Sequence, residues 1–212
     1  MTIEPRKVYL VDDDPAVRKT LRRGLERRGF SVETFKSAQE FLDCYHPKQP
    51  GCLVLDLSMP EMDGLELQQE LVNRDIKIPI IFITGHGGVP QSVQALKAGA
   101  IDFLEKPFLP DSLTARIEAG LIQDKINRDE KQKIESIRIK FGLLTERERE
   151  VAQLMLDNDA NLSNKQMAKI LGISPRTIEQ HRSRVLEKTH AKSAAHLRSL
   201  ASLIGLTPAN TE

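Results

Sequence analysis

Five short apolar runs, separated by longer stretches with helical periodicity, constrain the fold of this chain more than any other feature of its sequence. Most of the runs are continuous rather than alternating, as in parallel strands buried on both faces. The alternation of such strands with helices predicts a doubly wound, flavodoxin-like α/β domain with a five-stranded parallel sheet. The expected strands are residues 8–11, 32–35, 52–55, 80–83 and 101–104.

Helix-start signals lie between the runs and after them. Ser37 and Glu40 have the spacing of a capping box, and Pro90 is placed to open a helix. Beyond residue 142 the pattern is entirely helical, with helices expected at 146–157, 164–171, 174–188 and 193–204. Thr145 and Glu148 form a second capping-box pattern before the first of these helices.

The second and third of these helices are joined by the short segment LGISP, which contains a glycine turn. Ser174 is a natural N-cap, and Pro175 suits the first helical position. Two short helices joined in this way indicate a helix-turn-helix, so the chain is expected to end in an all-α domain.

Residues 121–141 contain mixed charges, scattered isoleucines and no Pro or Gly before Gly142, where the helix is expected to end. The pattern predicts an exposed helical linker. Its apolar spacing does not sustain a heptad repeat, so it does not predict a coiled coil.

Charge is distributed unevenly along the chain. Residues 1–120 carry 15 Lys/Arg against 18 Asp/Glu, a net charge of −3, whereas residues 121–212 carry 16 against 12, a net charge of +4. Residues 163–198 alone carry 8 against 2, or +6. Basic charge concentrated around a helix-turn-helix favours a polyanionic partner such as DNA.

Other classes of protein fit the sequence poorly. It contains no run of about 18 apolar residues, so no membrane span is expected. The first residues lack the apolar core of a signal peptide. Cys44 and Cys52 cannot build a disulfide framework and are expected to be inert thiols. We therefore expect a cytoplasmic protein.

Reactive groups follow four of the expected strands. Asp12 and Asp13 follow the first strand, Asp56 the third, Thr84 the fourth and Lys106 the fifth. The carboxyl ends of parallel strands form the crevice in which open α/β sheets bind ligands. Acids, a hydroxyl and an amine at that place are suited to a divalent metal and a phosphoryl group.

Residues 5–122 resemble the receiver domains of response regulators, through the motifs VDDD, LDLSMPEMDG, ITGHG and DFLEKPF. The resemblance implies that Asp56 accepts a phosphoryl group from the phosphohistidine of a sensor histidine kinase. It also implies that Lys106 and the Thr84 hydroxyl contact this group, that Gly85 leaves room for it, and that Thr84 and Phe103 act as switch residues. The implied ligands of Mg²⁺ (or Mn²⁺) are Asp12, Asp13, Asp56 and the backbone carbonyl of Ser58.

A phosphatase-type hydrolase also uses a strand-end aspartate with Mg²⁺. That superfamily carries a second acid two residues after the nucleophile, where this chain has Ser58. We therefore expect no enzyme, only a phosphoryl acceptor with Mg²⁺-dependent self-phosphorylation and dephosphorylation. His86 lies where family members tune the lifetime of the acyl phosphate, and the direction of its effect is left open.

Residues 144–206 resemble the LuxR-type DNA-binding domain, through LTEREREV, SNKQMAKILGIS, RTIEQHRSRVLEK and KSAAHLRSLA. The whole chain is similar to FixJ/NarL-type regulators, apart from a loop at 157–162 that is about three residues longer than usual. Ile178 and Val185 mark the inner face of the recognition helix. His181 is expected to pack rather than to bind a ligand. The expected DNA-contacting residues are Lys165, Arg176, Thr177, Gln180, Ser183 and Arg184, with Lys165 and Thr177 on phosphates.

These features predict a two-component response regulator with a receiver at 1–122, a helical linker at 123–141 and a DNA-binding domain at 142–212. Phosphorylation is expected to form a homodimer through the face around residues 90–105 and so to control promoter binding, with RNA polymerase as a further candidate partner. The alternative is a phosphorylation-dependent module whose helical end binds protein rather than DNA. The net charge of +6 over residues 163–198 argues against that alternative.

Overall fold

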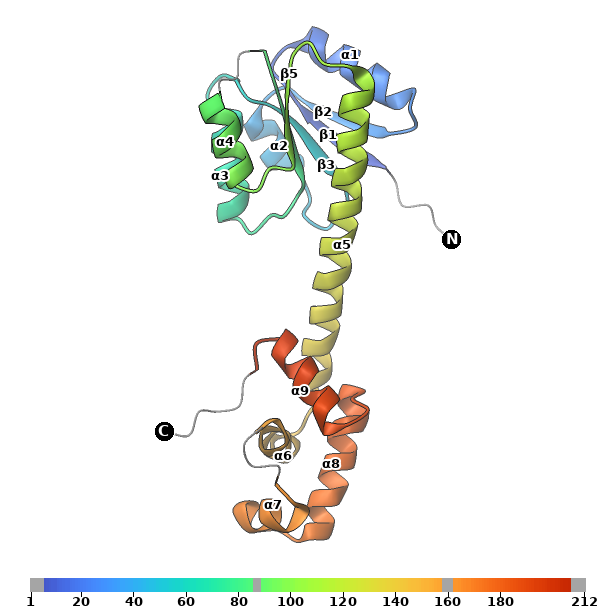
Figure 1. Ribbon diagram of the computed structural model, residues 1–212, viewed down its shortest axis with the longest axis vertical. Helices are drawn as coiled ribbons and strands as arrows, with labels where there is room; N and C mark the ends of the chain where they lie inside the picture. Colours follow the sequence, from blue (N-terminus) through green and yellow to red (C-terminus); the bar gives the residue numbers. More distant parts are fainter. Residues whose placement is uncertain (1–5, 86–88, 158–161, 207–212) are drawn as a thin grey trace. The chain divides into compact units, whose positions relative to one another are not determined.

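The computed structural model describes residues 6–85, 89–157 and 162–206, without the side chains of residues 89–91. The chain divides after Arg128 into two compact units. One helix, α5 (Pro110–Gly142), runs through this boundary and contributes to both units (Figure 1).

The first unit is built on a five-stranded parallel sheet with the strand order β2-β1-β3-β4-β5, which confirms the predicted fold class. Strands β3 and β4 are buried at every position, which explains why their sequences are continuous apolar runs. Each strand lies within one residue of its predicted bounds at both ends. The strands are β1 (Lys7–Val11), β2 (Ser31–Phe35), β3 (Cys52–Asp56), β4 (Ile80–Thr84) and β5 (Asp102–Glu105).

Helices cover both faces of this sheet (Figure 1). One core cluster joins Phe41 of α2 (Ala38–Cys44) and Leu67 of α3 (Gly64–Asn73) to one face, where α4 (Val89–Lys97) also packs. The other cluster joins Leu25 of α1 (Pro15–Glu26) and Ile117 of α5 to the opposite face. Because side chains alternate along a strand, each strand contributes to both clusters.

Two helix starts show how local sequence directs the chain. Ser37 caps α2 by accepting a hydrogen bond from the Glu40 backbone N–H at 3.2 Å. Glu40 does not close the predicted capping box, because its carboxylate accepts from the backbone N–H of Lys36 instead. Asp14 caps α1, accepting from the backbone N–H groups of Ala16 and Val17, so the acidic run that ends β1 also starts the next helix.

The second unit contains four short helices packed with the end of α5. They are α6 (Glu146–Leu156), α7 (Asn164–Leu171), α8 (Pro175–Thr189) and α9 (Ala194–Leu203). Val151, Ile178, Val185 and Leu197 are fully buried at the centre of this unit. The predicted capping box of Thr145 and Glu148 at the start of α6 is confirmed.

Helix α5 differs from the exposed linker that its sequence suggests. It ends at Gly142, as predicted, and Ile122, Ile126 and Ile139 are exposed. Ile137 is instead buried in the core of the second unit, and Asp124 is buried against the first. None of the helices in the described ranges combines the length and apolar composition that a membrane span requires. Most of the longer loop at 157–162 lies outside the described residues.

Candidate functional site

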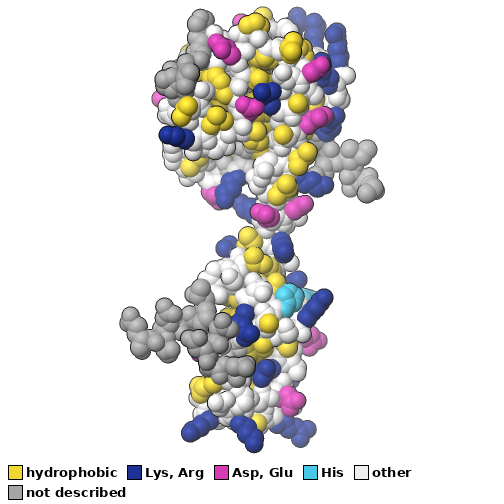
Figure 2. All heavy atoms as spheres, viewed as in Figure 1, with side chains coloured by type: hydrophobic (Ala, Val, Ile, Leu, Met, Phe, Trp, Pro, Cys, Tyr) yellow, Lys and Arg dark blue, Asp and Glu magenta, His cyan; other side chains and the backbone are white. Residues whose placement is uncertain are grey.

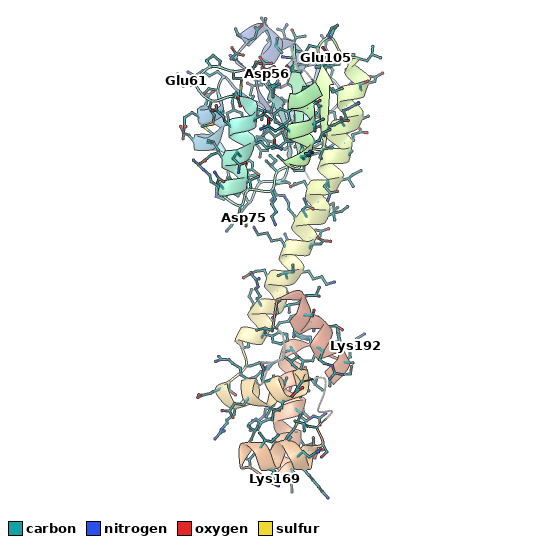
Figure 3. All side chains as sticks on the ribbon, turned by 60° about the vertical axis from the view of Figure 1, so that its left-hand side comes forward. Asp56, Glu61, Asp75, Glu105, Lys169 and Lys192 are labelled. Carbon is teal, nitrogen blue, oxygen red and sulfur yellow. The ribbon has the colours of Figure 1, made fainter. Side chains whose placement is uncertain are left out.

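The carboxyl ends of four strands bring the predicted reactive groups together. Asp56 is the last residue of β3, and Thr84 is the last residue of β4. Asp12 and Lys106 lie one residue beyond β1 and β5. The parallel register places β1 and β4 on either side of β3, so the four residues line one edge of the sheet. Figure 3 labels Asp56 at this edge of the first unit.

Lys106 joins two buried carboxylates. Its Nζ lies 2.7 Å from Oδ1 of Asp56 and 2.9 Å from Oδ2 of Asp12. Burial raises the pKa of Asp56, although the hydrogen bond and charge of Lys106 act in the opposite direction. Burial by itself would lower the pKa of Lys106, but the hydrogen bonds and charges of the two carboxylates outweigh it and raise the pKa. One ammonium thus holds two acids that would otherwise repel each other.

The remaining carboxylate oxygens are held by the backbone. Oδ2 of Asp56 accepts from the backbone N–H of Ser58 at 2.9 Å, and Oδ1 of Asp12 accepts from that of Asp14 at 2.9 Å. Nη1 of Arg18 donates to the backbone carbonyl of Asp12 at 2.6 Å. Arg18 is not among the residues expected from the sequence, because only its placement one turn into α1 brings it back to the strand end.

The donor set fits a divalent cation. Buried carboxylates of Asp12 and Asp56 are hard oxygen ligands of the kind that Mg²⁺ prefers, and Mg²⁺ keeps several waters, so few protein ligands are needed. In the part of the chain that the structure describes, no group of three or more His, Cys, Asp or Glu is already arranged around one point. Asp13 is exposed and makes no described side-chain contact. The position between the two acids is taken by the Lys106 ammonium.

The two predicted switch residues differ in their surroundings. Thr84 is fully buried, and its backbone carbonyl accepts from the Lys106 N–H at 2.7 Å. Phe103 is half-buried, with its ring centroid 6.4 Å from that of Phe82. A Cβ placed on Gly85 would meet no described atom within 4 Å, which is consistent with open space beside Thr84. His86 lies outside the described residues.

The helix-turn-helix is formed by α7 and α8. Gly172 ends α7 in the left-handed conformation, with φ of 66°, which a glycine adopts without strain. Ser174 caps α8 by accepting from the Thr177 backbone N–H at 3.1 Å, and Pro175 occupies the first turn, as predicted. Ser163 and Gln166 form a capping box at the start of α7 that the sequence analysis did not single out.

The exposed face of α8 carries most of the predicted DNA-contacting residues. Its inner face is formed by Ile178, Val185 and Thr189. Thr177 is half-buried, with its hydroxyl 2.8 Å from that of Ser174. Figure 2 shows Lys and Arg side chains at the end of the second unit that α7 and α8 form. The exposed members of the predicted set are Lys165, Arg176, Gln180, Ser183 and Arg184.

Two further contacts fix α8 in place. Nη1 of Arg182 donates to Oδ1 of Asn164 at the start of α7, at 2.5 Å. Nζ of Lys188 lies 2.6 Å from the buried carboxylate of Glu148 in α6. His181 is half-buried, and its Nδ1 is a buried atom without a hydrogen-bond partner in the described part of the chain. The Arg182–Asn164 and Lys188–Glu148 contacts join residues far apart in sequence, so no local pattern could have revealed them.

The first unit therefore has the fold and strand-end chemistry of a receiver, and the second has the helix-turn-helix of a DNA-binding domain. Residues 8–118 match the model of the response regulator receiver domain, and residues 142–201 match that of bacterial regulatory proteins of the luxR family. The chain belongs to the two-component response regulators that join these two domains, and within them to the FixJ/NarL type. It is a regulator of transcription controlled by phosphorylation.

Its relatives include two transcriptional regulatory proteins named FixJ. The FixJ of Rhizobium meliloti is 43% identical over 204 residues, covering 95% of this chain and 97% of that protein. The FixJ of Bradyrhizobium diazoefficiens is 41% identical over 199 residues, covering 94% and 96%. Among solved structures, the response regulator StyR matches with 43% identity and a TM-score of 0.83, over 93% of this chain and 98% of that one.

Proposed function

We propose that Asp56 is the phosphoacceptor and that a sensor histidine kinase is its phosphodonor. The observation that carries this assignment is the placement of Lys106, whose Nζ lies within 2.9 Å of the buried carboxylates of Asp12 and Asp56. Among the strand-end acids, Asp56 alone combines burial, a lysine contact and a neighbouring threonine at the end of the adjacent strand β4.

The transfer follows from the charges in the pocket. A carboxylate oxygen of Asp56 attacks phosphorus, the P–N bond of the phosphohistidine breaks, and the imidazole nitrogen leaves with the electron pair. Lys106 and the Thr84 hydroxyl stabilise the negative charge on the phosphoryl oxygens. Mg²⁺ or Mn²⁺, when bound by Asp12, Asp13, Asp56 and the Ser58 carbonyl, supplies further positive charge there. Hydrolysis of the acyl phosphate would return the receiver to its first state.

The phosphoryl group is proposed to act on a two-state receiver. Thr84 moves toward the acyl phosphate, and the half-buried Phe103 turns further inward into the space that Thr84 leaves. The face around residues 90–105 then pairs with a second copy. Two DNA-binding domains are thereby placed on adjacent promoter half-sites, where they can contact RNA polymerase. A DNA-bound regulator of this kind acts in the cytoplasm.

We assign the receiver to residues 1–122, the linker to 123–141 and the DNA-binding domain to 142–212. On the DNA, Lys165 and Thr177 are assigned to phosphates, because they lie at helix starts, and the exposed face of α8 to base edges. Base contacts are assigned to Arg176, Gln180, Ser183 and Arg184.

Labelling with a small phosphodonor tests the phosphoacceptor. We expect Asp56→Asn to abolish acyl-phosphate formation by acetyl phosphate and Mg²⁺. Asp43→Asn is the matched control, because Asp43 is an exposed carboxylate on α2, and it should be labelled like the unaltered protein. Undiminished labelling of Asp56→Asn, with the phosphate mapped to another residue, would refute the assignment.

The alternative of a protein-binding helical end is tested separately. Mobility shifts on genomic DNA fragments should weaken steeply as salt rises, because each phosphate contact releases counterions. Absence of any salt-dependent shift, with and without phosphodonor, would favour the protein-binding alternative.

A further inference from the structure

A second concentration of basic side chains lies on the receiver, along α1. A groove of about 390 Å³ runs between α1 and the edge strand β2. Residues 1–120 carry a net charge of −3, yet this groove has four basic residues against one acid. Figure 2 shows Lys and Arg side chains gathered over α1. The lining residues are Pro15, Arg18, Lys19, Arg22, Arg23, Glu26 and Thr34.

Two of these cations, and Arg27 at the end of α1, have no anionic partner in the part of the chain that the structure describes. Arg18 donates to the Asp12 carbonyl, and Nε of Arg22 pairs with Glu26 at 2.8 Å. The exposed side chains of Lys19, Arg23 and Arg27, in contrast, make no hydrogen bond or ion pair within the described ranges. Their spacing of four residues places them along one face of α1, with Arg27 as its C-cap residue. They form a row of uncompensated positive charge in an otherwise acidic unit.

The composition of the groove points to a ligand recognised by charge alone. It contains no aromatic or large aliphatic side chain that could anchor a protein partner, and protein interfaces depend on such anchors. The opposite side of α1 is different, because Val17, Leu21 and Phe108 line an apolar groove of about 440 Å³ there. A phosphate backbone needs only positive charge, and guanidinium forks match phosphate geometry.

We propose that the α1 row of Lys19, Arg23 and Arg27, with the groove beside it, binds the phosphate backbone of DNA. This contact rests on the proposed DNA binding of the helix-turn-helix and adds to it. Once that domain is bound, the neighbouring DNA is present at high effective concentration, so even weak phosphate contacts of the receiver contribute. Such contacts carry no sequence information and would strengthen binding to flanking DNA of any sequence.

The dependence of DNA affinity on salt tests this proposal in the full chain. The triple variant Lys19→Gln, Arg23→Gln, Arg27→Gln should bind sheared genomic DNA of one length with a shallower plot of log affinity against log salt. Each lost phosphate contact removes about 0.9 from the slope, so a reduction of about 2–3 is expected. Labelling of Asp56 by acetyl phosphate should be unchanged in this variant. Unchanged labelling would show that the receiver of the variant is folded.

A charge-matched control separates contact from net charge. Lys48→Gln, Lys77→Gln, Lys125→Gln removes three exposed cations elsewhere in the first unit and should leave the slope close to that of the unaltered protein. Equal slopes for the α1 variant and the unaltered protein would overturn the proposal while leaving DNA binding itself intact. Reduced phosphotransfer from a kinase at an unchanged slope would also overturn it, in favour of an acidic protein partner. No DNA binding by the unaltered chain would instead refute the proposed function.

Discussion

Asp124 and Arg128, one turn apart on α5, form a partly buried ion pair with Nε and Oδ2 2.7 Å apart. The same carboxylate oxygen accepts from the Gly51 backbone N–H at 3.0 Å. Arg128 also donates to the backbone carbonyls of Pro47 and Gln49. The pair thus fastens α5 to the loop before β3, at the edge of the sheet opposite Asp56.

Removing one member of this pair should destabilise the receiver. Arg128→Ala leaves the Asp124 carboxylate, which is 2% exposed, without its cation. Removing one partner of a buried ion pair costs about 3–5 kcal/mol. Because Arg128 is partly exposed, we expect a somewhat smaller loss, about 2–4 kcal/mol. Urea unfolding of the full chain measures it. The double variant Asp124→Asn, Arg128→Ala should lose less than the sum of Asp124→Asn and Arg128→Ala measured singly, and strict additivity would contradict the coupling.

The Glu148–Lys188 pair should make the second unit sensitive to acid. The hydrogen bond from Lys188, followed by that from the Thr145 backbone N–H, lowers the pKa of Glu148 to about 2 from 4.5. A carboxyl with a lowered folded pKa stabilises the fold fully above its unfolded value. That contribution should therefore be lost as the pH falls from about 4.5 toward 2.

Thermal unfolding of Glu148→Gln tests this dependence. The variant should be less stable by about 1–3 kcal/mol at neutral pH, the range for a hydrogen bond to a charged group, and its stability should change less between pH 5 and 2. Glu150→Gln is the control, since the Arg147–Glu150 pair is exposed and such pairs contribute little to stability. Equal pH dependence of both variants would contradict the role of Glu148.

Lys106 should set the pH range in which Asp56 reacts. Burial already raises the pKa of Asp56, and Lys106 opposes that rise. Lys106→Met should raise the pKa of Asp56 further. On acidification, Asp56 of this variant should therefore be protonated, and stop reacting, at a higher pH than in the unaltered protein. Labelling by acetyl phosphate as a function of pH measures the shift. Lys106→Arg keeps the charge and should move the profile less, whereas identical profiles for all three proteins would exclude this role.

Base and phosphate contacts of the DNA-binding domain should differ in their effect on sequence preference. Arg184→Ala should cost about 1–3 kcal/mol on a preferred site and little on other DNA. Lys165→Ala should weaken binding to all sequences alike and reduce the salt slope by about 1. Competition between genomic fragments and random DNA separates the two effects. A uniform loss for Arg184→Ala would reassign it to the backbone.

The strand-end site could be predicted from sequence because every signal for it is local. Apolar runs locate the strands, and the residues that follow them must meet at one edge of a parallel sheet. The sequence could not tell which acid of the Asp12–Asp13 pair faces Lys106. Successive residues of an extended chain point in opposite directions, so one acid is buried and the other exposed, and only the packing decides which.

Contacts between distant segments could not be predicted in the same way. Gly51 lies 73 residues before Asp124, and Glu148 lies 40 residues before Lys188. Nothing in the charged stretch 121–141 distinguishes Asp124 or Ile137, which are buried, from their exposed neighbours. Their burial depends on which face of α5 meets each unit, and this is determined by the tertiary fold rather than by α5 itself.

The α4 surface is the predicted place of phosphorylation-dependent pairing. Val93 and Leu96 on α4 are 42% and 45% exposed, so apolar surface is available there for a second copy. The unmodified protein should be mostly monomeric, and its dimer fraction should rise with beryllofluoride and Mg²⁺. A coupling of about 1–3 kcal/mol is sufficient to produce such a change at micromolar concentration.

Sedimentation of substituted proteins locates the pairing surface. Leu96→Asp should abolish the rise in dimer fraction, because it places a charge in the apolar contact. Val72→Asp is the matched control, since Val72 is 56% exposed on α3, and it should dimerise normally. A tight dimer with and without beryllofluoride would mean that α5 or the DNA-binding domain holds the chains together. Phosphorylation would then have to act by rearranging a dimer that already exists.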